Sequence, residues 1–253
     1  MIPYFTNPTG AAVADAARQR GFAIIRDALP DHARFREAAL NIYPKTKEDG
    51  FREAHADALV ALDRGDIWPH IFEANTDLKY HDAFACEPAQ EAVTLLVGPS
   101  TPTKQTIIRV GPHGAENTTP GVPLHTDGII QGDAVFSVTL WITLDRCGDE
   151  TPGLVIVDDG HEGVRAYTEF KGGTRTLPIG EWDYDRYSEA AFRPDAIRAH
   201  YGPRVLTPIL DAGDMVIFTN WTIHGTLLGG NKPRLAIIER YDGDQFDPLF
   251  DPL

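Results

Sequence analysis

The chain has 253 residues, which is long enough for one large domain with a sizeable core. Hydrophobic residues make up 42% and charged residues 24%, proportions that are ordinary for a globular protein and argue against long disordered segments. The formal net charge of -14 argues against nucleic acid as a partner, because a phosphate backbone requires a basic protein face.

The cysteines, Cys86 and Cys147, are too few for a disulfide framework or a cysteine zinc site, and they fit a reducing compartment. The first residues do not show a basic region followed by an apolar run, and no later stretch is apolar for long enough to span a bilayer. We therefore expect a cytoplasmic protein with no membrane partner. The sequence leaves the oligomeric state open.

The N-terminal part, about residues 1–100, is predicted to be mainly helical. A helix is expected from about Ala11 to Arg20, ending at Gly21, and the apolar run Phe22–Ile25 predicts a buried strand. Apolar residues at helical spacing after Asp31 predict a second helix. Further helices are expected over Phe51–Leu62, Leu78–Ala85 and Gln90–Leu96.

From Thr103 onward the composition changes: Val, Ile and Thr become dense, and Gly and Pro separate short runs. So many short runs predict a mainly β fold of jelly-roll or cupin-like type, with the N-terminal helices packed on one sheet. The candidate strands are Gln105–Val110, Val122–Asp127, Ala134–Leu144, Leu154–Val157, Val205–Leu210, Asp214–Thr219, His224–Leu228 and Arg234–Tyr241.

A long polar and aromatic insertion at about 160–203 interrupts the strand-rich region. Segments of this length inside a domain are often lids or binding elements, and this one is predicted to hold a short helix near Ser188–Arg193. We expect a single domain over residues 1–253, in which a jelly-roll core at about 103–241 contains the insertion.

The stretch Pro123–Gly128 offers an imidazole at His125 and a carboxylate at Asp127. In an extended strand, residues i and i+2 point to the same face, so these two side chains can bind one metal ion from one side. His224 is the best candidate for a third ligand. Two histidines and one carboxylate on one face form the ligand set of non-haem Fe(II) oxygenases. We therefore predict an iron oxygenase.

Each part of this pattern has an ordinary alternative. The stretch His55–Asp57 has the same His-x-Asp spacing in a predicted helix, where the two side chains do not share a face. His224 alone can be a hydrogen-bonded core histidine. Arg234 can be a surface cation, but its place at the head of an apolar strand indicates a guanidinium that needs an anion. A small dicarboxylate that binds iron at one end can place its other end there.

The sequence resembles the phytanoyl-CoA dioxygenase-like family of Fe(II)/2-oxoglutarate-dependent oxygenases, and the resemblance covers most of the chain. It implies a double-stranded β-helix in which iron is bound by His125, Asp127 and His224. It also implies 2-oxoglutarate as cosubstrate, with its distal carboxylate held by Arg234 and Thr226. The stretches that carry the resemblance are Pro123–Gly128, Trp141–Asp145, Gly213–Asp214, His224–Thr226, Pro233–Arg234 and Gly21–Leu29.

The activity that the resemblance implies is hydroxylation of an unactivated C–H bond of a small-molecule substrate, with consumption of O2 and release of succinate and CO2. Related halogenases lack the carboxylate that Asp127 supplies here, which favours hydroxylation over halogenation and leaves desaturation or ring formation open. Gln105 and Trp141 are further predicted at the cosubstrate pocket, and Arg109 and Trp221 at the substrate. For each of these four, packing in the core or at the surface is the alternative.

Two rival functions stay open at this point. One is a cupin-like metal enzyme with the same ligands and no 2-oxoglutarate, such as an isomerase or a direct dioxygenase; the other is a non-catalytic ligand-binding barrel. Arg234 argues against a simple metal site, and oxygen-dependent conversion of 2-oxoglutarate to succinate separates the enzymes. The sequence does not name the substrate.

Overall fold

The computed structural model describes residues 2–42, 67–111, 121–122, 124–125, 127, 136–158, 199, 201–227 and 229–243. The helices predicted over Phe51–Leu62 and near Ser188–Arg193, and most of the predicted insertion, lie outside these residues, as does the His55–Asp57 pair. No helix within the described ranges is long and apolar enough to cross a membrane.

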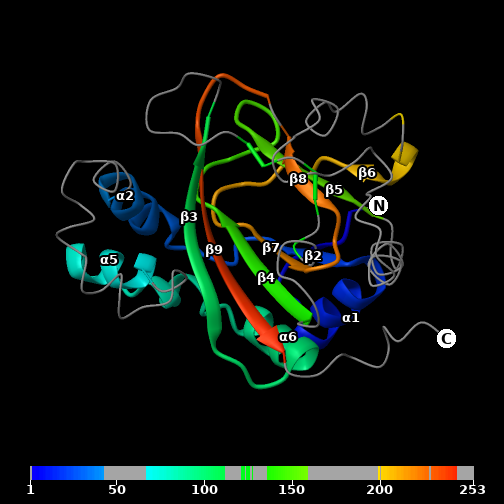
Figure 1. Cartoon of the computed structure of the whole chain (residues 1–253), viewed down its shortest axis with the longest axis horizontal. Coiled ribbons are helices and arrows are strands. Elements are labelled where there is room, and N and C mark those ends of the chain that lie inside the picture. The colour runs from blue at the N-terminus through cyan, green and yellow to red at the C-terminus, as the bar shows by residue number, and fades with distance from the viewer. Residues whose placement is uncertain are drawn as a thin grey trace, which may run out of the picture.

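Two β-sheets form the centre of the fold (Figure 1). The larger sheet has the order β1-β2-β7-β4-β9-β3, and its neighbouring strands are antiparallel except for β1 and β2. Its strands are β1 (Tyr4–Phe5), β2 (Phe22–Ile25), β3 (Pro102–Val110), β4 (Phe136–Thr143), β7 (Met215–Thr219) and β9 (Arg234–Gly243). The smaller sheet has the order β6-β5-β8, from β5 (Gly153–Val157), β6 (Val205–Leu206) and β8 (His224–Leu227).

The helices cover one face of the larger sheet. They are α1 (Gly10–Arg20), α2 (His32–Ile42), α5 (Ile67–Asn75) and α6 (Glu87–Val97), with the short 3-10 helix η2 (Tyr80–Phe84). A second 3-10 helix, η4 (Gly202–Arg204), directly precedes β6 of the smaller sheet. Figure 1 shows α1 and α6 together at one end of the sheet and α2 and α5 beyond β3. The Thr9 hydroxyl caps α1 by accepting from the Ala12 amide, and Gly21 ends it at a φ of 85°.

Strand alternation gives the larger sheet two different faces. The residues that pack against the helices include Ala23, Ile25, Val138, Leu140, Ile142, Met215, Ile217, Leu235 and Ile237. Their neighbours along the same strands form a second cluster with the smaller sheet, which contains Phe22, Ile24, Trp141, Leu154, Ile156, Val216, Phe218 and Ala236. The second face therefore lies between the two sheets, and it is the face on which a pocket can form.

Most of the predicted elements are confirmed with small changes in their ends. The helices predicted after Thr9 and after Asp31 are α1 and α2, and the buried strand is β2. The segment Leu78–Ala85 is a 3-10 helix over Tyr80–Phe84 and not an α-helix. The short strand β1 and the helix α5 were not predicted. Two layered sheets with helices on one face agree with the predicted mainly β fold and are consistent with a jelly roll.

Two predicted strands are wrong in part. Over Val205–Leu210 only Val205 and Leu206 pair as β6, because Pro208 has no N–H to donate to a ladder, and Leu210 then forms an isolated bridge with Cys147. In the segment predicted as a strand up to Asp127, His125 forms a single bridge to His224 and Asp127 already has helical backbone.

We expect Tyr80→Phe to lower the free energy of unfolding by about 1–3 kcal/mol, since it removes a buried hydroxyl whose carbonyl partners lie on two strands. That hydroxyl is 2.7 Å from Thr106 O and 3.1 Å from Ile238 O, so it ties η2 to β3 and β9. Urea denaturation measures the loss, and Tyr4→Phe, on an exposed ring, serves as the control with a smaller effect. A Tyr80→Phe variant as stable as the wild type would contradict this role.

Candidate metal centre

An antiparallel backbone bridge sets two imidazoles side by side. The His125 amide donates to His224 O and the His224 amide donates to His125 O, each at 2.8 Å. The two ring centroids are 4.4 Å apart. After this bridge the chain turns into helical backbone, and Asp127 Oδ1 comes to 3.4 Å from His125 Nε2. Sequence reasoning expected the two side chains to share the face of one strand; in the structure Asp127 has helical backbone, and the two side chains still come together.

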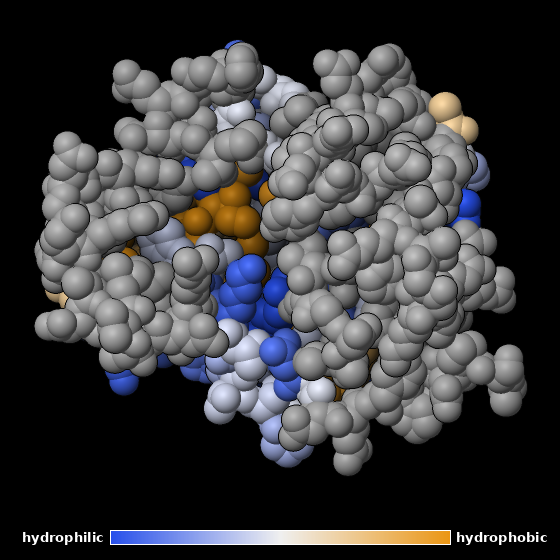
Figure 2. Space-filling model, viewed as in Figure 1, coloured by the Kyte–Doolittle hydropathy of each residue, from blue (hydrophilic) through white to orange (hydrophobic). Residues whose placement is uncertain are grey.

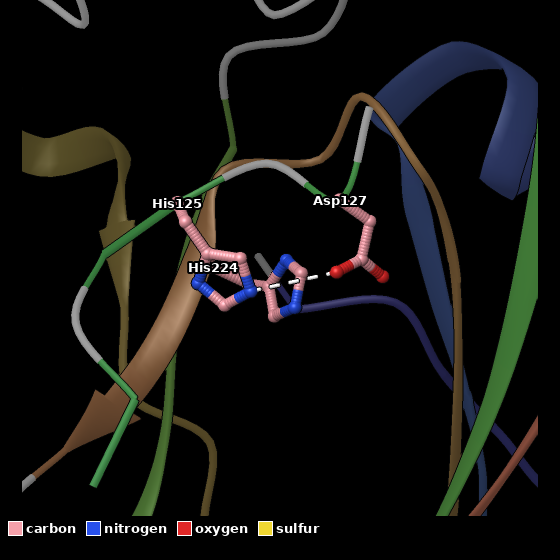
Figure 3. Close-up of side chains that lie close together, drawn as sticks. All are labelled: His125, Asp127 and His224. Carbon is pink, nitrogen blue, oxygen red and sulfur yellow. Dashed lines mark ion pairs between the residues drawn. The ribbon is translucent and has the colours of Figure 1, made fainter. Parts of the chain in front are cut away.

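The side chains of His125, Asp127 and His224 converge, as Figure 3 shows, with His224 coming from β8. One possible ligand atom from each lies within 4.8 Å of the others, and all three residues are buried. Buried imidazoles and a carboxylate at this spacing can hold one metal ion from one side and leave its other positions open. The donor set therefore fits a divalent transition metal such as iron.

The His224 ring is oriented by two neighbours. Its Nδ1 lies 2.9 Å from Thr222 O, and its ring packs on Phe218 with centroids 4.3 Å apart. A carbonyl partner requires the proton on Nδ1, which leaves Nε2 as the ligand atom. Burial, and after it the neighbouring His125, lowers the pKa of His224 from 6.5 to about 4. The imidazole is therefore neutral at neutral pH, which is the form that binds metals.

The Asp127 carboxylate is held by the larger sheet. Its Oδ2 accepts from Arg240 Nη2 at 2.6 Å and from the Thr139 hydroxyl at 3.4 Å, and Arg240 Nε donates to that hydroxyl at 3.3 Å. Burial opposes ionisation of Asp127, but the hydrogen bond to His125, the charge that His224 gains in acid, and the permanent charge of Arg240 outweigh it. Together they hold the pKa of the carboxyl well below its usual range. Asp127 is therefore an anionic group fixed by a charge-assisted hydrogen bond, in a form that can bind a metal ion.

A cavity of about 220 Å³ opens beside these three residues. Its described lining comes from both sheets and from the segment before Asp127, and includes Lys104, Thr106, Ile108, Val122, Thr139, Trp141, Leu154, Phe218, Gly225, Thr226, Arg234, Ile238 and Arg240. In Figure 2 a hollow on this side of the molecule has apolar surface next to hydrophilic surface. The cavity is thus a mixed pocket with apolar walls and a few cations.

Arg234 lies in this pocket with an unused donor. It is only 2% exposed, its Nη1 donates to Gly153 O at 3.0 Å, and its guanidinium carbon is 5.0 Å from the centre of the Trp141 ring. Its buried Nε has no hydrogen-bond partner among the residues that the structure describes. A buried unpaired donor on a cation is costly unless an anion enters. Arg234 therefore fits the distal carboxylate of a small dicarboxylate such as 2-oxoglutarate.

Two more predicted residues lie where a cosubstrate would contact them. Thr226 lines the pocket, and its hydroxyl accepts from the Val122 amide at 2.9 Å. That hydroxyl keeps its own proton for a further acceptor. Trp141 also lines the pocket and lies under the Arg234 guanidinium. The structure thus places Thr226, Trp141 and Arg234 in one cavity with the three converging residues.

The placement of Gln105, Arg109 and Trp221 corrects the sequence predictions for these residues. Gln105 is on the helix-facing side of β3 and donates to the buried Glu239, and it is not among the residues that line the pocket. By strand alternation Arg109 shares that face, and Trp221 belongs to the core under the helices. These residues are close in the sequence to residues that line the pocket, but their side chains lie on the helix-facing side of the larger sheet.

Lys104, Thr139 and Arg240 are among the pocket residues that sequence reasoning missed. Thr139 and Arg240 are cross-strand partners, as are Arg240 and Lys104. No local motif marks them, because their closeness to Asp127 depends on the register of three strands far apart in the sequence. The spacing of polar residues in β9 could have indicated Arg240, because residues an even number apart in a strand point to the same face and Arg240 therefore shares a face with Arg234.

No family model and no curated protein matches this sequence. Solved structures do match over nearly the whole chain. The non-heme alpha ketoglutarate dependent carbocyclase SnoK from nogalamycin biosynthesis has 15% identity and a TM-score of 0.59, with 93% of this chain and 86% of that chain covered. At such identities the comparisons show a shared fold.

Two further structures of this fold were solved with ligands. The epimerase SnoN, in complex with Fe3+, alpha ketoglutarate and nogalamycin RO, has 16% identity, a TM-score of 0.55 and coverage of 96% of this chain and 90% of that chain. EvdO2 from Micromonospora carbonacea var. aurantiaca, complexed with 2-oxoglutarate, has 14% identity, a TM-score of 0.52 and coverage of 94% of both chains. Proteins with this fold thus bind iron and 2-oxoglutarate, and this chain has a His-Asp-His group that can hold a metal.

We expect Arg240→Met to weaken metal binding about 10- to 100-fold, because Asp127 loses the donor that orients its carboxylate. Anaerobic titration with Fe(II) or Co(II) measures the affinity. Arg34→Met is the matched control, since Arg34 is exposed and pairs with Asp31 on the surface. Equal metal affinity in the Arg240→Met and Arg34→Met variants would show that Arg240 does not position the ligand.

Proposed function

We propose that this chain is a non-haem Fe(II)- and 2-oxoglutarate-dependent oxygenase that hydroxylates an unactivated C–H bond of a small molecule and releases succinate and CO2. The observation that carries the proposal is one cavity with a His-Asp-His group at its wall and Arg234, with an unpaired buried Nε, in its lining. A metal site alone would not explain a buried arginine with a free donor. The motifs quoted above support placement in the phytanoyl-CoA dioxygenase-like family.

The residues take the following roles in this proposal. His125, Asp127 and His224 bind the iron, and Arg234 with Thr226 binds the distal carboxylate of 2-oxoglutarate. The bound iron, with 2-oxoglutarate and O2, supplies the oxidising chemistry. The protein supplies geometry: Arg240 and Thr139 fix the carboxylate ligand, and Thr222 fixes the tautomer of His224.

The pocket walls serve the same reaction by excluding water. Leu154, Phe218 and Ile238 line the cavity next to the charged groups. Apolar walls strengthen the ionic contacts of a bound dicarboxylate and limit side reactions with solvent. They also provide the surface against which a substrate C–H bond can be held near the metal.

We favour hydroxylation among the outcomes open to this type of site. Among the proteins of similar fold, SnoK is described as a carbocyclase and SnoN as an epimerase, so the fold serves more than one outcome. In this chain Asp127 supplies the carboxylate ligand, whose position halogenases leave free for a halide. Halogenation is therefore disfavoured here.

Arg234→Lys is expected to weaken 2-oxoglutarate binding about 10- to 100-fold, because a lysine cannot reproduce the two parallel hydrogen bonds of a guanidinium. The measurement is the anaerobic titration of Fe(II)-loaded protein with 2-oxoglutarate, followed by the visible charge-transfer band. Arg34→Lys on the surface controls for the change of residue type, and circular dichroism checks that the buried substitution still folds. An unchanged titration in a folded Arg234→Lys variant would remove the cosubstrate assignment.

Oxygen-dependent conversion of 2-oxoglutarate to succinate tests the activity itself. The wild-type protein with Fe(II) is expected to form succinate slowly without substrate and faster with an accepted small molecule. Asp127→Ala is expected to abolish this turnover, since it removes the anionic ligand. If the wild type forms no succinate with any member of a broad substrate panel, the proposed activity is wrong.

A further inference from the structure

Lys104 stands beside the candidate metal centre on the pocket wall. In the register of the larger sheet Lys104 pairs with Arg240, and Arg240 pairs with Thr139. All three side chains line the pocket, in one row across β3, β9 and β4. This is the row that holds the Asp127 carboxylate, so the Lys104 ammonium lies at the same level as the candidate metal ligands.

The two cations of this row differ in their partners. Arg240 donates to Asp127 at 2.6 Å, so its charge is compensated. The Lys104 ammonium makes no hydrogen bond or ion pair with any residue in the described part of the chain. Burial, followed by the nearby charge of Arg240, lowers the pKa of Lys104, while Asp127 acts in the opposite direction. Lys104 is nevertheless exposed at the pocket, so its ammonium is open to an anion that enters there.

Lys104 is separated from the arginine that we assign to the cosubstrate. Arg234 and Arg240 are the first and seventh residues of β9, so their Cα atoms are about 20 Å apart at ~3.4 Å per residue. Lys104 lies at the Arg240 end of this strand pair. A small dicarboxylate that joins the metal to Arg234 would therefore leave the Lys104 ammonium available to a different molecule.

Between Arg234 at one end and Lys104 with Arg240 at the other, the part of the pocket wall that β3 and β9 form is mostly apolar. Ile108 and Ile238 line it, with Thr106 beside them. A molecule bound next to Lys104 thus meets one cation and an extended apolar surface.

We propose that Lys104 binds an anionic group, a carboxylate or a phosphate, on the primary substrate, whose apolar body lies on the pocket walls that the cosubstrate leaves free. This inference rests on the proposed function, since it takes Arg234 and the metal to be occupied by 2-oxoglutarate. It names the substrate class: small amphipathic anions. Lys104 is the residue that selects and orients substrates of this class.

Binding of matched probes to the protein loaded anaerobically with Fe(II) and 2-oxoglutarate tests the proposal. The probes are hexanoate, hexyl phosphate and the neutral hexanamide, and calorimetry measures their affinities. We expect at least one anion to bind the wild type about 10-fold more tightly than hexanamide. The Lys104→Met variant should bind that anion only as tightly as it binds hexanamide, and its affinity for hexanamide should equal that of the wild type. The tighter of the two anions assigns the group as carboxylate or phosphate.

Two control variants accompany the test. Lys104→Arg keeps the charge and should keep the preference for the anion. Lys79→Met removes an exposed lysine that makes no capping hydrogen bond for η2, and it should behave as the wild type. Equal affinity of hexanamide and both anions for the wild type would overturn the proposal, as would anion binding that is unchanged in Lys104→Met.

The 2-oxoglutarate titration of the same variants separates this inference from the proposed function. Lys104→Met should leave that titration unchanged; if it weakens the titration and spares the anions, Lys104 serves the cosubstrate and the proposal is wrong. If 2-oxoglutarate does not bind the wild type, the proposed function fails. The assignment of Lys104 is then judged by the anion and amide affinities in the Fe(II) protein.

Discussion

The paired backbone of His125 and His224 is the constraint on which the candidate site depends. Two hydrogen bonds of 2.8 Å fix the two residues opposite each other, and the Thr226 amide donates to Val122 O at 2.8 Å along the same segment. Because β8 also pairs with β5, the smaller sheet holds both histidines at fixed places. The metal-binding geometry is therefore set by main-chain hydrogen bonds before any metal enters.

The third member of the group, Asp127, is held by the other sheet. Thr139 of β4 and Arg240 of β9 bind its carboxylate. A buried carboxylate with one charged partner is stable only while that partner stays in place. The site thus spans the space between the two sheets, and relative movement of the sheets would change the distance between the histidines and the carboxylate.

Strand alternation then decides which side chains can take part. On β9, Arg234, Ile238 and Arg240 face the pocket, whereas Glu239 and Tyr241 face the helices. Glu239 is satisfied there by hydrogen bonds from Gln105 and from the Tyr241 hydroxyl. One sheet therefore carries a metal-side pocket on one face and a polar cluster within the helical layer on the other.

Local patterns in the sequence were sufficient for most elements and for the three residues that converge in the candidate site, whose role in metal binding stays a prediction. Apolar periodicity and caps predicted α1, α2 and β2, and the His-x-Asp spacing with the distant His224 and Arg234 indicated which residues the fold would bring together. The sequence did not reveal on which face Gln105 and Arg109 lie, because a one-residue change of strand phase reverses every side chain. It also missed Arg240 and Lys104, whose roles depend on cross-strand register.

An anaerobic crystal structure of the protein with Fe(II) and 2-oxoglutarate tests the central claim most directly. The account predicts iron coordinated by His125, Asp127 and His224, and the distal carboxylate of 2-oxoglutarate hydrogen-bonded to the Nε of Arg234. Iron bound at other residues, or 2-oxoglutarate bound away from Arg234, would contradict it.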